Sequence, residues 1–354
     1  MVREIVEDHK PLAYVLGTQP FFPLPVDLAV RPPTLIPRPE TEHWVNVLLE
    51  KVLAARPPAT GSSAPQAPSR PFRILDIGTG SGCIALALTY GLGFRPDAKS
   101  DGRSLRVQTV AVDQSKQALQ LARENAERCG ISTRGRSTEP GACADSADTT
   151  TDQPDPAVPL PPLTLLHADL FAPDFASTAL AAAAASSSGP RRFDLIVSNP
   201  PYIPEHEYLT LDASVRVWED RRALVGERCL PPEADGEAAA PSPVPSDGTT
   251  RKASNTDGLV FYRRIVSLLD ELLAFPPSSS TPGHAAEPEC AEPVVAFEVG
   301  RGQATAVRDL LSRWRPRTRT DSSDGPTLET EIVTDPWGVE RAVFARWKRH
   351  RDPS

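Results

Sequence analysis

The sequence predicts an α/β fold in which helices cover a mostly parallel sheet of seven strands. Short apolar runs rich in Val, Ile, Leu and Phe alternate along the chain with longer segments of helical periodicity. Such alternation is typical of parallel strands joined by right-handed crossover helices. The last two apolar runs have no helical segment between them, so we expect an antiparallel hairpin at the end of the sheet.

The individual elements follow from the period of the apolar residues. Strands are predicted at 72–77, 107–112, 163–168, 193–197 and 294–299, and the hairpin strands at 330–333 and 341–347. Helical spacing predicts helices at 40–55, 83–90, 115–129, 262–273 and 303–314. Before them, residues 11–38 alternate through Val26, Leu28 and Val30, which predicts a short β-rich N-terminal arm.

Stretches rich in Pro, Ser, Ala and Thr lie between these elements. Segments so poor in large apolar residues cannot offset the entropy of ordering, and a longer loop adds little to the cost of closure. We therefore predict an N-terminal arm and helix at 1–55 and a main domain at 71–348 with low-complexity inserts. The insert positions are 56–70, 91–104, 133–162, 176–190, 228–256, 276–292 and 315–327.

Composition limits the classes of partner. The formal net charge of −8 disfavours a nucleic-acid binder, because phosphate neutralisation usually requires a basic surface. No apolar run is long enough to span a membrane. The chain has five cysteines without a Cys-x-x-Cys pair, so neither a disulfide framework nor a metal site is expected.

A glycine-rich loop follows the first predicted strand of the sheet. The segment 76–82 reads Asp-Ile-Gly-Thr-Gly-Ser-Gly, and the next strand is followed by Asp113, whose carboxylate could accept both ribose hydroxyls. Ligands bind at the carboxyl ends of parallel strands, where glycines allow close approach to the backbone. A dinucleotide site normally has Gly-x-Gly-x-x-Gly, whereas Gly-x-Gly-x-Gly after an acid is typical of S-adenosylmethionine sites. The predicted cofactor-binding residues are Gly78, Thr79, Gly80, Ser81, Gly82 and Asp113.

The fourth predicted strand ends in Asn199-Pro200-Pro201-Tyr202. Two prolines hold the backbone extended and remove two amide donors, which leaves the Pro200 carbonyl and the Asn199 side chain available as acceptors. Together they could accept both hydrogens of a substrate NH₂ group, while Tyr202 offers a flat face to a planar amide or base. Such acceptors would stabilise the positive charge that develops on nitrogen during methyl transfer.

Several functions are compatible with this tetrapeptide. The nitrogen could be an amide or the exocyclic amine of adenine or guanine in a nucleic acid, where a flipped base would stack on the aromatic ring. A catalytically silent binding module that keeps the fold is a further alternative. An NAD-dependent oxidoreductase is disfavoured by the glycine spacing.

Further motifs make the chain similar to the HemK/PrmC family, the release factor glutamine methyltransferases. The resemblance rests on the loops above and on Pro-Leu-Ala-Tyr-Val-Leu-Gly at 11–17, Leu-Ile-Pro-Arg-Pro-Glu-Thr-Glu at 35–42, Asp-Gly-Leu at 257–259 with Tyr262-Arg263, Phe-Glu-Val-Gly at 297–300 and Gly-Gln-Ala at 302–304. It implies a Rossmann-like class I S-adenosylmethionine-dependent methyltransferase domain. The implied activity is methylation of the glutamine side-chain amide in the Gly-Gly-Gln motif of a class 1 peptide-chain release factor.

The resemblance also implies roles for individual residues. Asn199 would touch both cofactor and substrate, and Pro200, Pro201 and Tyr202 would complete the amide pocket, with Asn199, Pro200 and Tyr202 as the catalytic set. The mouth of the site would be shaped by Arg38 and Glu40, as substrate-binding residues. The family often has an aromatic residue after the acid that ends the third strand, but here Leu170 follows Asp169 and would be the cofactor contact.

Two departures from the family bear on partners and location. The resemblance implies an N-terminal helical domain that this chain does not include, and Glu-Asp-Arg at 219–221 replaces the common Glu-Pro-Arg. The low-complexity inserts favour a eukaryotic, mitochondrial homologue, the alternative location being the cytoplasm. We expect a monomer that binds a release factor, with neither nucleic acid nor a membrane as partner.

Overall fold

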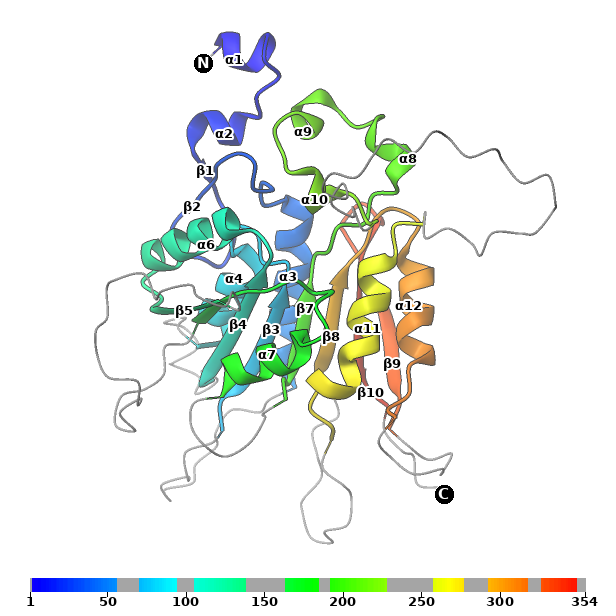
Figure 1. Cartoon of the computed structure of the whole chain (residues 1–354). Coiled ribbons are helices and arrows are strands. Elements are labelled where there is room, and N and C mark those ends of the chain that lie inside the picture. The colour runs from blue at the N-terminus through cyan, green and yellow to red at the C-terminus, as the bar shows by residue number, and fades with distance from the viewer. Residues whose placement is uncertain are drawn as a thin grey trace, which may run out of the picture.

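The computed structural model describes residues 2–55, 70–93, 105–137, 163–184, 192–227, 257–276, 292–317 and 326–348. Its centre is an eight-stranded sheet of order β5-β6-β4-β3-β7-β8-β10-β9 (Figure 1). The strands are β3 (Phe72–Ile77), β4 (Val107–Asp113), β5 (Thr133–Ser137), β6 (Leu163–His167), β7 (Leu195–Ser198), β8 (Pro293–Glu298), β9 (Leu328–Thr334) and β10 (Glu340–Trp347). Only β10 is antiparallel to its neighbours β8 and β9, which confirms the parallel sheet and the terminal hairpin.

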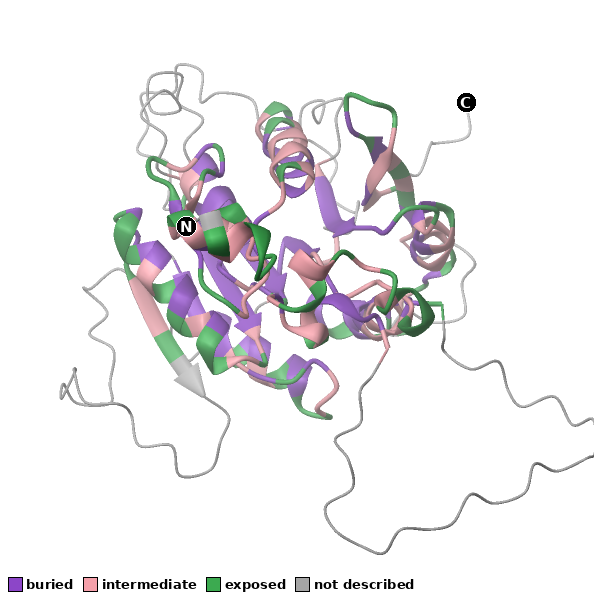
Figure 2. Ribbon diagram, turned by 90° about the horizontal axis from the view of Figure 1, so that it is seen from above, coloured by how far each residue is buried: buried purple, intermediate pink, exposed green. Residues whose placement is uncertain are grey.

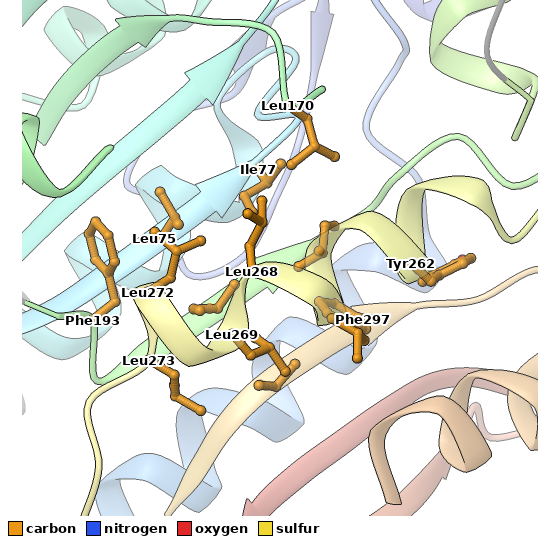
Figure 3. Close-up of a cluster of buried hydrophobic side chains, with 14 of the residues drawn as sticks. Leu75, Ile77, Leu170, Phe193, Tyr262, Leu268, Leu269, Leu272, Leu273 and Phe297 are labelled. Atoms are coloured by element: carbon orange, nitrogen blue, oxygen red, sulfur yellow. The ribbon is translucent and has the colours of Figure 1, made fainter. Parts of the chain in front are cut away.

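Helices cover both faces of the sheet (Figure 1). One face carries α3 (Pro39–Ala54), α4 (Cys83–Gly93) and α6 (Lys116–Arg128), and the other α7 (Phe175–Ala183), α11 (Val260–Leu272) and α12 (Ala304–Arg313). Alternation along β3 divides the core, because Leu75 and Ile77 pack with α7 and α11 while Phe72 and Ile74 pack with α3 and α4. Figure 3 shows the first of these clusters, and Figure 2 shows buried residues concentrated in the middle of the molecule.

The number of strands was wrong by one. Residues 133–137, which were predicted to begin an insert, form β5 and pair in parallel with β6. The sequence Thr-Arg-Gly-Arg-Ser lacks the apolar pattern of a strand because β5 lies at the sheet edge, where the backbone ladder rather than a buried side-chain face holds it. The other seven strands of the sheet lie at the seven predicted positions in the sequence.

The insert predicted at 176–190 was also partly wrong. Residues 176–183 belong to α7, and Ala179 and Ala183 are fully buried against the sheet. Alanine is the best helix former, and its small side chain permits close packing. The other insert positions, at 56–69, 94–104, 138–162, 185–191, 228–256, 277–291 and 318–325, lie outside the described residues.

The N-terminal arm is less β-rich than predicted. It contains α1 (Val2–Val6), α2 (Leu12–Leu16) and two two-residue strands, β1 (Thr18–Gln19) and β2 (Leu28–Ala29), paired antiparallel. Asn125 of α6 fixes the arm, because its side chain accepts the Ala29 N–H at 2.7 Å and donates to the carbonyls of Ala29 and Ser81. The arm is thereby joined to the glycine loop. None of the helices in the described ranges is long and apolar enough to cross a membrane.

Candidate active site

A cavity of about 510 Å³ lies at the carboxyl edge of the parallel strands. Its walls come from residues that follow β3, β4, β6 and β7, and its roof from residues 33–38 of the arm. In the sheet, β4 lies on one side of β3 and β7 lies on the other side. The direction of the strand order therefore changes at β3, and the cavity lies at this topological switch point, where ligands bind in such sheets.

The glycine loop forms one wall. Gly78 and Gly80 have φ of 77° and 56°, which favour glycine, and the N–H groups of Gly78 and Thr79 donate to the Val112 carbonyl at 2.8 and 2.9 Å. A Cβ at Gly80 would meet no atom within 4 Å, so the backbone there faces open space. Gly78, Thr79, Gly80 and Ser81, which were predicted to bind the cofactor, line the cavity.

Gly82 was also predicted to bind the cofactor. It does not line the cavity, and a Cβ there would lie 3.1 Å from the Cβ of Ala122 in α6. The third glycine therefore serves close packing between the loop and a neighbouring helix.

Asp113 is held at the end of β4 with its carboxylate on the cavity wall. One oxygen accepts the Gly80 N–H at 2.9 Å and the other the Ser115 N–H at 2.8 Å. Burial raises the pKa of Asp113, while the bonds from Ser115 and Gly80 act against that rise. Since each carboxylate oxygen has a second lone pair, the group can still accept two hydroxyls.

The apolar side of the cavity contains Leu170, which was predicted to contact the cofactor, and two aromatic residues that the prediction missed. Phe171 and Phe261 line the cavity and pack edge to face with ring centroids 5.2 Å apart. Phe171 follows Leu170 directly, so an aromatic one place further along was a usable signal. Phe261 comes from α11 and had no such signal.

The residues of the Asn-Pro-Pro-Tyr turn lie partly on the cavity wall and partly against the hydrophobic core. Asn199, Pro200 and Pro201 line the cavity, whereas Tyr202 does not and packs against the main core. The Tyr202 carbonyl accepts the Gln303 side-chain N–H at 2.9 Å. Burial raises the pKa of Tyr202 well above its usual value, so the phenol stays protonated.

Of the two residues predicted at the mouth, only Arg38 lines the cavity. Its guanidinium donates to both carboxylate oxygens of Glu219, at 2.7 and 2.6 Å, and the Glu219 side chain is fully buried. Glu40 instead accepts from Arg341 at 3.3 Å, away from the cavity. The arm is thus clamped to the segment that follows the Asn-Pro-Pro-Tyr turn.

Other residues around the cavity were not predicted. Thr41, Asp220, Arg222 and Glu227 also line it, and the two carboxylates among them come from the segment beyond the turn. Within the described ranges, no group of three or more His, Cys, Asp or Glu residues could hold a metal ion.

Known proteins resemble this chain along most of its length, although no family model matches it. The release factor glutamine methyltransferase of Geobacter sulfurreducens is 32% identical over 337 residues, which cover 95% of this chain and 73% of the relative. The protein of the same name from Chlorobaculum tepidum is 33% identical over 257 residues, covering 73% of this chain and 67% of the relative. The chain belongs to the release factor glutamine methyltransferase family.

Solved structures are similar to this chain at a lower level. A SAM-dependent methyltransferase from Agrobacterium tumefaciens has a TM-score of 0.37 and 12% identity, covering 88% of this chain and 63% of that one. The N-terminal domain of human METTL16 has a TM-score of 0.40 and 14% identity, covering 90% and 75%. Membership of the release factor glutamine methyltransferase family rests on the sequence relatives, and the Rossmann-like fold on the strand order.

The cavity fits the cofactor that a family methyltransferase requires. S-adenosylmethionine has a ribose, an adenine ring and a charged amino-acid part, and the wall offers a carboxylate, an apolar aromatic side and open backbone for them. Asp113 would accept hydrogen bonds from the ribose hydroxyls, and Leu170 and Phe171 would contact the adenine ring. Gly78 and Gly80 would let the cofactor approach the backbone closely.

Proposed function

We propose that this chain is a protein-(glutamine) N-methyltransferase that methylates the side-chain amide of the Gly-Gly-Gln glutamine in a class 1 peptide-chain release factor. S-adenosylmethionine is its methyl donor. One observation carries the proposal: Asn199 and Pro200 lie on the wall of the same cavity as the glycine loop and Asp113. Acceptors for an NH₂ group therefore stand beside the cofactor site.

The chemistry requires help because an amide nitrogen is a poor nucleophile. Its lone pair is delocalised into the carbonyl, and the nitrogen becomes positive as the bond to carbon forms. The cofactor, when bound, would supply an electrophilic methyl group on a sulfonium, whose carbon–sulfur bond breaks to leave S-adenosylhomocysteine. The methylated nitrogen then loses one proton to water, because that proton becomes acidic as the nitrogen becomes positive. The Asn199 side-chain oxygen and the Pro200 carbonyl accept hydrogen bonds from the two N–H groups of the substrate amide. These bonds direct the nitrogen lone pair toward the methyl group and stabilise the charge that develops on nitrogen. One such acceptor can change the rate about 100- to 1000-fold.

The chain's other residues have supporting roles in this proposal. Pro200 and Pro201 provide no backbone donor that would compete for the acceptors. Tyr202 stiffens the turn through its core packing and the bond from Gln303. Arg38 shapes the cavity roof through Glu219, and Glu40 supports it from outside through Arg341.

Mass spectrometry of a release factor incubated with the chain and S-adenosylmethionine tests the proposal. We expect a single methyl group on the Gly-Gly-Gln peptide, and none when glutamine is replaced by alanine. Parallel reactions contain single-stranded DNA or RNA instead of protein. Methylated nucleic acid together with an unmodified release factor would contradict the proposal.

The proposal also includes a mitochondrial location and a monomeric state. The low-complexity inserts support a mitochondrial release factor as substrate. The acidic net charge supports a chain that acts without nucleic acid, and its self-repulsion favours a monomer. Fluorescence microscopy of the tagged chain tests the location, and sedimentation tests the mass. A cytoplasmic signal or a dimer mass would contradict the respective part.

A further inference from the structure

A buried chain of polar groups lies behind Asn199. Glu298, at the end of β8, is 4% exposed, and its Oε2 accepts the Thr41 hydroxyl at 2.6 Å and the Trp44 indole N–H at 2.8 Å. Thr41 in turn lies beside Asn199, with 3.5 Å between the Thr41 Oγ1 and the Asn199 Nδ2. Three separate motifs of the sequence, at 35–42, 199–202 and 297–300, thus meet in one network.

The direction of the hydrogen bonds follows from the donor inventory. An indole N–H can only donate, so Oε2 of Glu298 acts as an acceptor, and the Thr41 hydroxyl gives its single hydrogen to that oxygen. The remaining lone pairs of Oγ1 can only accept. They therefore favour the NH₂ side of the Asn199 amide over its carbonyl side.

This arrangement determines which end of the amide faces the substrate. When Nδ2 faces Thr41, Oδ1 of Asn199 points the other way. The carbonyl end is the one that can accept an N–H bond from the nitrogen to be methylated. Without the Thr41 hydroxyl, the Asn199 amide could rotate and point its NH₂ group at the substrate nitrogen. An NH₂ group is a donor and cannot accept a hydrogen bond from the substrate N–H.

We propose that Thr41 and Glu298 are positioning residues that hold the Asn199 amide with Oδ1 toward the substrate nitrogen. The identity of that nitrogen rests on the proposed function, whereas the orientation of the amide does not. Thr41 and Glu298 both lie in motifs of the sequence, but neither was predicted to be a catalytic residue.

Two substitutions at Thr41 separate orientation from packing. Thr41→Val removes the hydroxyl at nearly constant volume, and Thr41→Ser keeps the hydroxyl. We expect Thr41→Val to lower kcat about 10- to 100-fold, as misorientation of a reacting group does, while KM for cofactor and acceptor changes less than about twofold. Thr41→Ser should recover most of the lost rate. An unchanged kcat in Thr41→Val, a change confined to KM, or equal losses in both variants would overturn the proposal.

An NMR experiment tests the orientation without any acceptor. The chain has four asparagines, so ¹⁵N-asparagine labelling gives few side-chain signals, and the signal lost in Asn199→Ala identifies Asn199. Thr41→Val should move the Asn199 amide protons and leave those of Asn125, which donates to Ala29 and Ser81, in place.

The two possible failures are distinguishable. Unmoved Asn199 signals would overturn the positioning role even if the release factor is methylated. Moved signals in a chain that does not methylate Gly-Gly-Gln would support the positioning role and contradict the proposed function. The ratio of kcat between the unaltered chain and Thr41→Val is then measured with whichever acceptor the unaltered chain methylates.

Discussion

Replacing Arg38 with leucine should destabilise the chain in a pH-dependent manner. The substitution leaves the Glu219 carboxyl buried without the guanidinium that donates to both of its oxygens. A buried ion pair that loses one partner costs about 3–5 kcal/mol. Because the Arg38 side chain is 33% exposed, water screens part of the interaction, and we expect about 2–3 kcal/mol. For a folded unit of about 150–250 residues, a range that includes the described part of the chain, that loss lowers Tm by about 4–12 °C.

The pH dependence follows from the direction of the pKa shift. Burial already raises the pKa of Glu219, and the charge of Arg38 opposes that rise. Without Arg38, the folded-state pKa moves further above the unfolded-state value, so the folded chain binds the proton more tightly. The destabilisation is therefore full where the carboxyl is ionised and shrinks as pH falls through the variant's folded-state pKa.

Thermal unfolding at pH 8 and pH 5 measures both effects. The Tm difference between the unaltered chain and Arg38→Leu should be larger at pH 8. The control is the double variant Arg38→Leu/Glu219→Leu, which replaces the pair by apolar side chains and should recover much of the lost stability. Equal Tm losses at both pH values, or a double variant less stable than the single one, would refute the reasoning.

Four other substitutions have distinct expected outcomes. Gly258 and Gly130 share a φ of 71°, but a Cβ at Gly258 would overlap the Tyr202 carbonyl, whereas nothing lies within 4 Å at Gly130. In urea unfolding, Gly130→Ala should therefore cost about 1 kcal/mol and Gly258→Ala at least about 3 kcal/mol; equal costs would contradict the clash. Asn199→Ala should lower kcat about 100- to 1000-fold in a methyl-incorporation assay with Tm unchanged, and retained turnover would remove its role. Burial raises the pKa of Asp76 to about 7, so the unaltered chain loses stability as pH rises from the unfolded value toward 7. Asp76→Asn should remove that loss, and an unchanged pH profile of Tm would contradict it.

Much of the site could be predicted because parallel strands end at one edge. The glycine loop, Asp113 and Asn199 each follow a strand, and strand ends in such a sheet converge whatever lies between them. Local signals were sufficient here, since turn chemistry and apolar period are properties of short segments. The same reasoning failed at β5 (Thr133–Ser137) and at the alanine-rich part of α7, because an edge strand needs no apolar face and a run of alanine resembles a linker.

The sequence by itself determined the fold class, the edge of the sheet where the cavity lies and several of the residues that line it. Only the tertiary structure decided that Tyr202 turns toward the core, that Glu219 receives Arg38, and that Glu298 and Thr41 lie behind Asn199. These contacts join residues more than a hundred positions apart, and no local period or turn encodes them. They depend on which groups remain buried and unpaired once the helices close over the sheet, since a buried polar group must find its partner there.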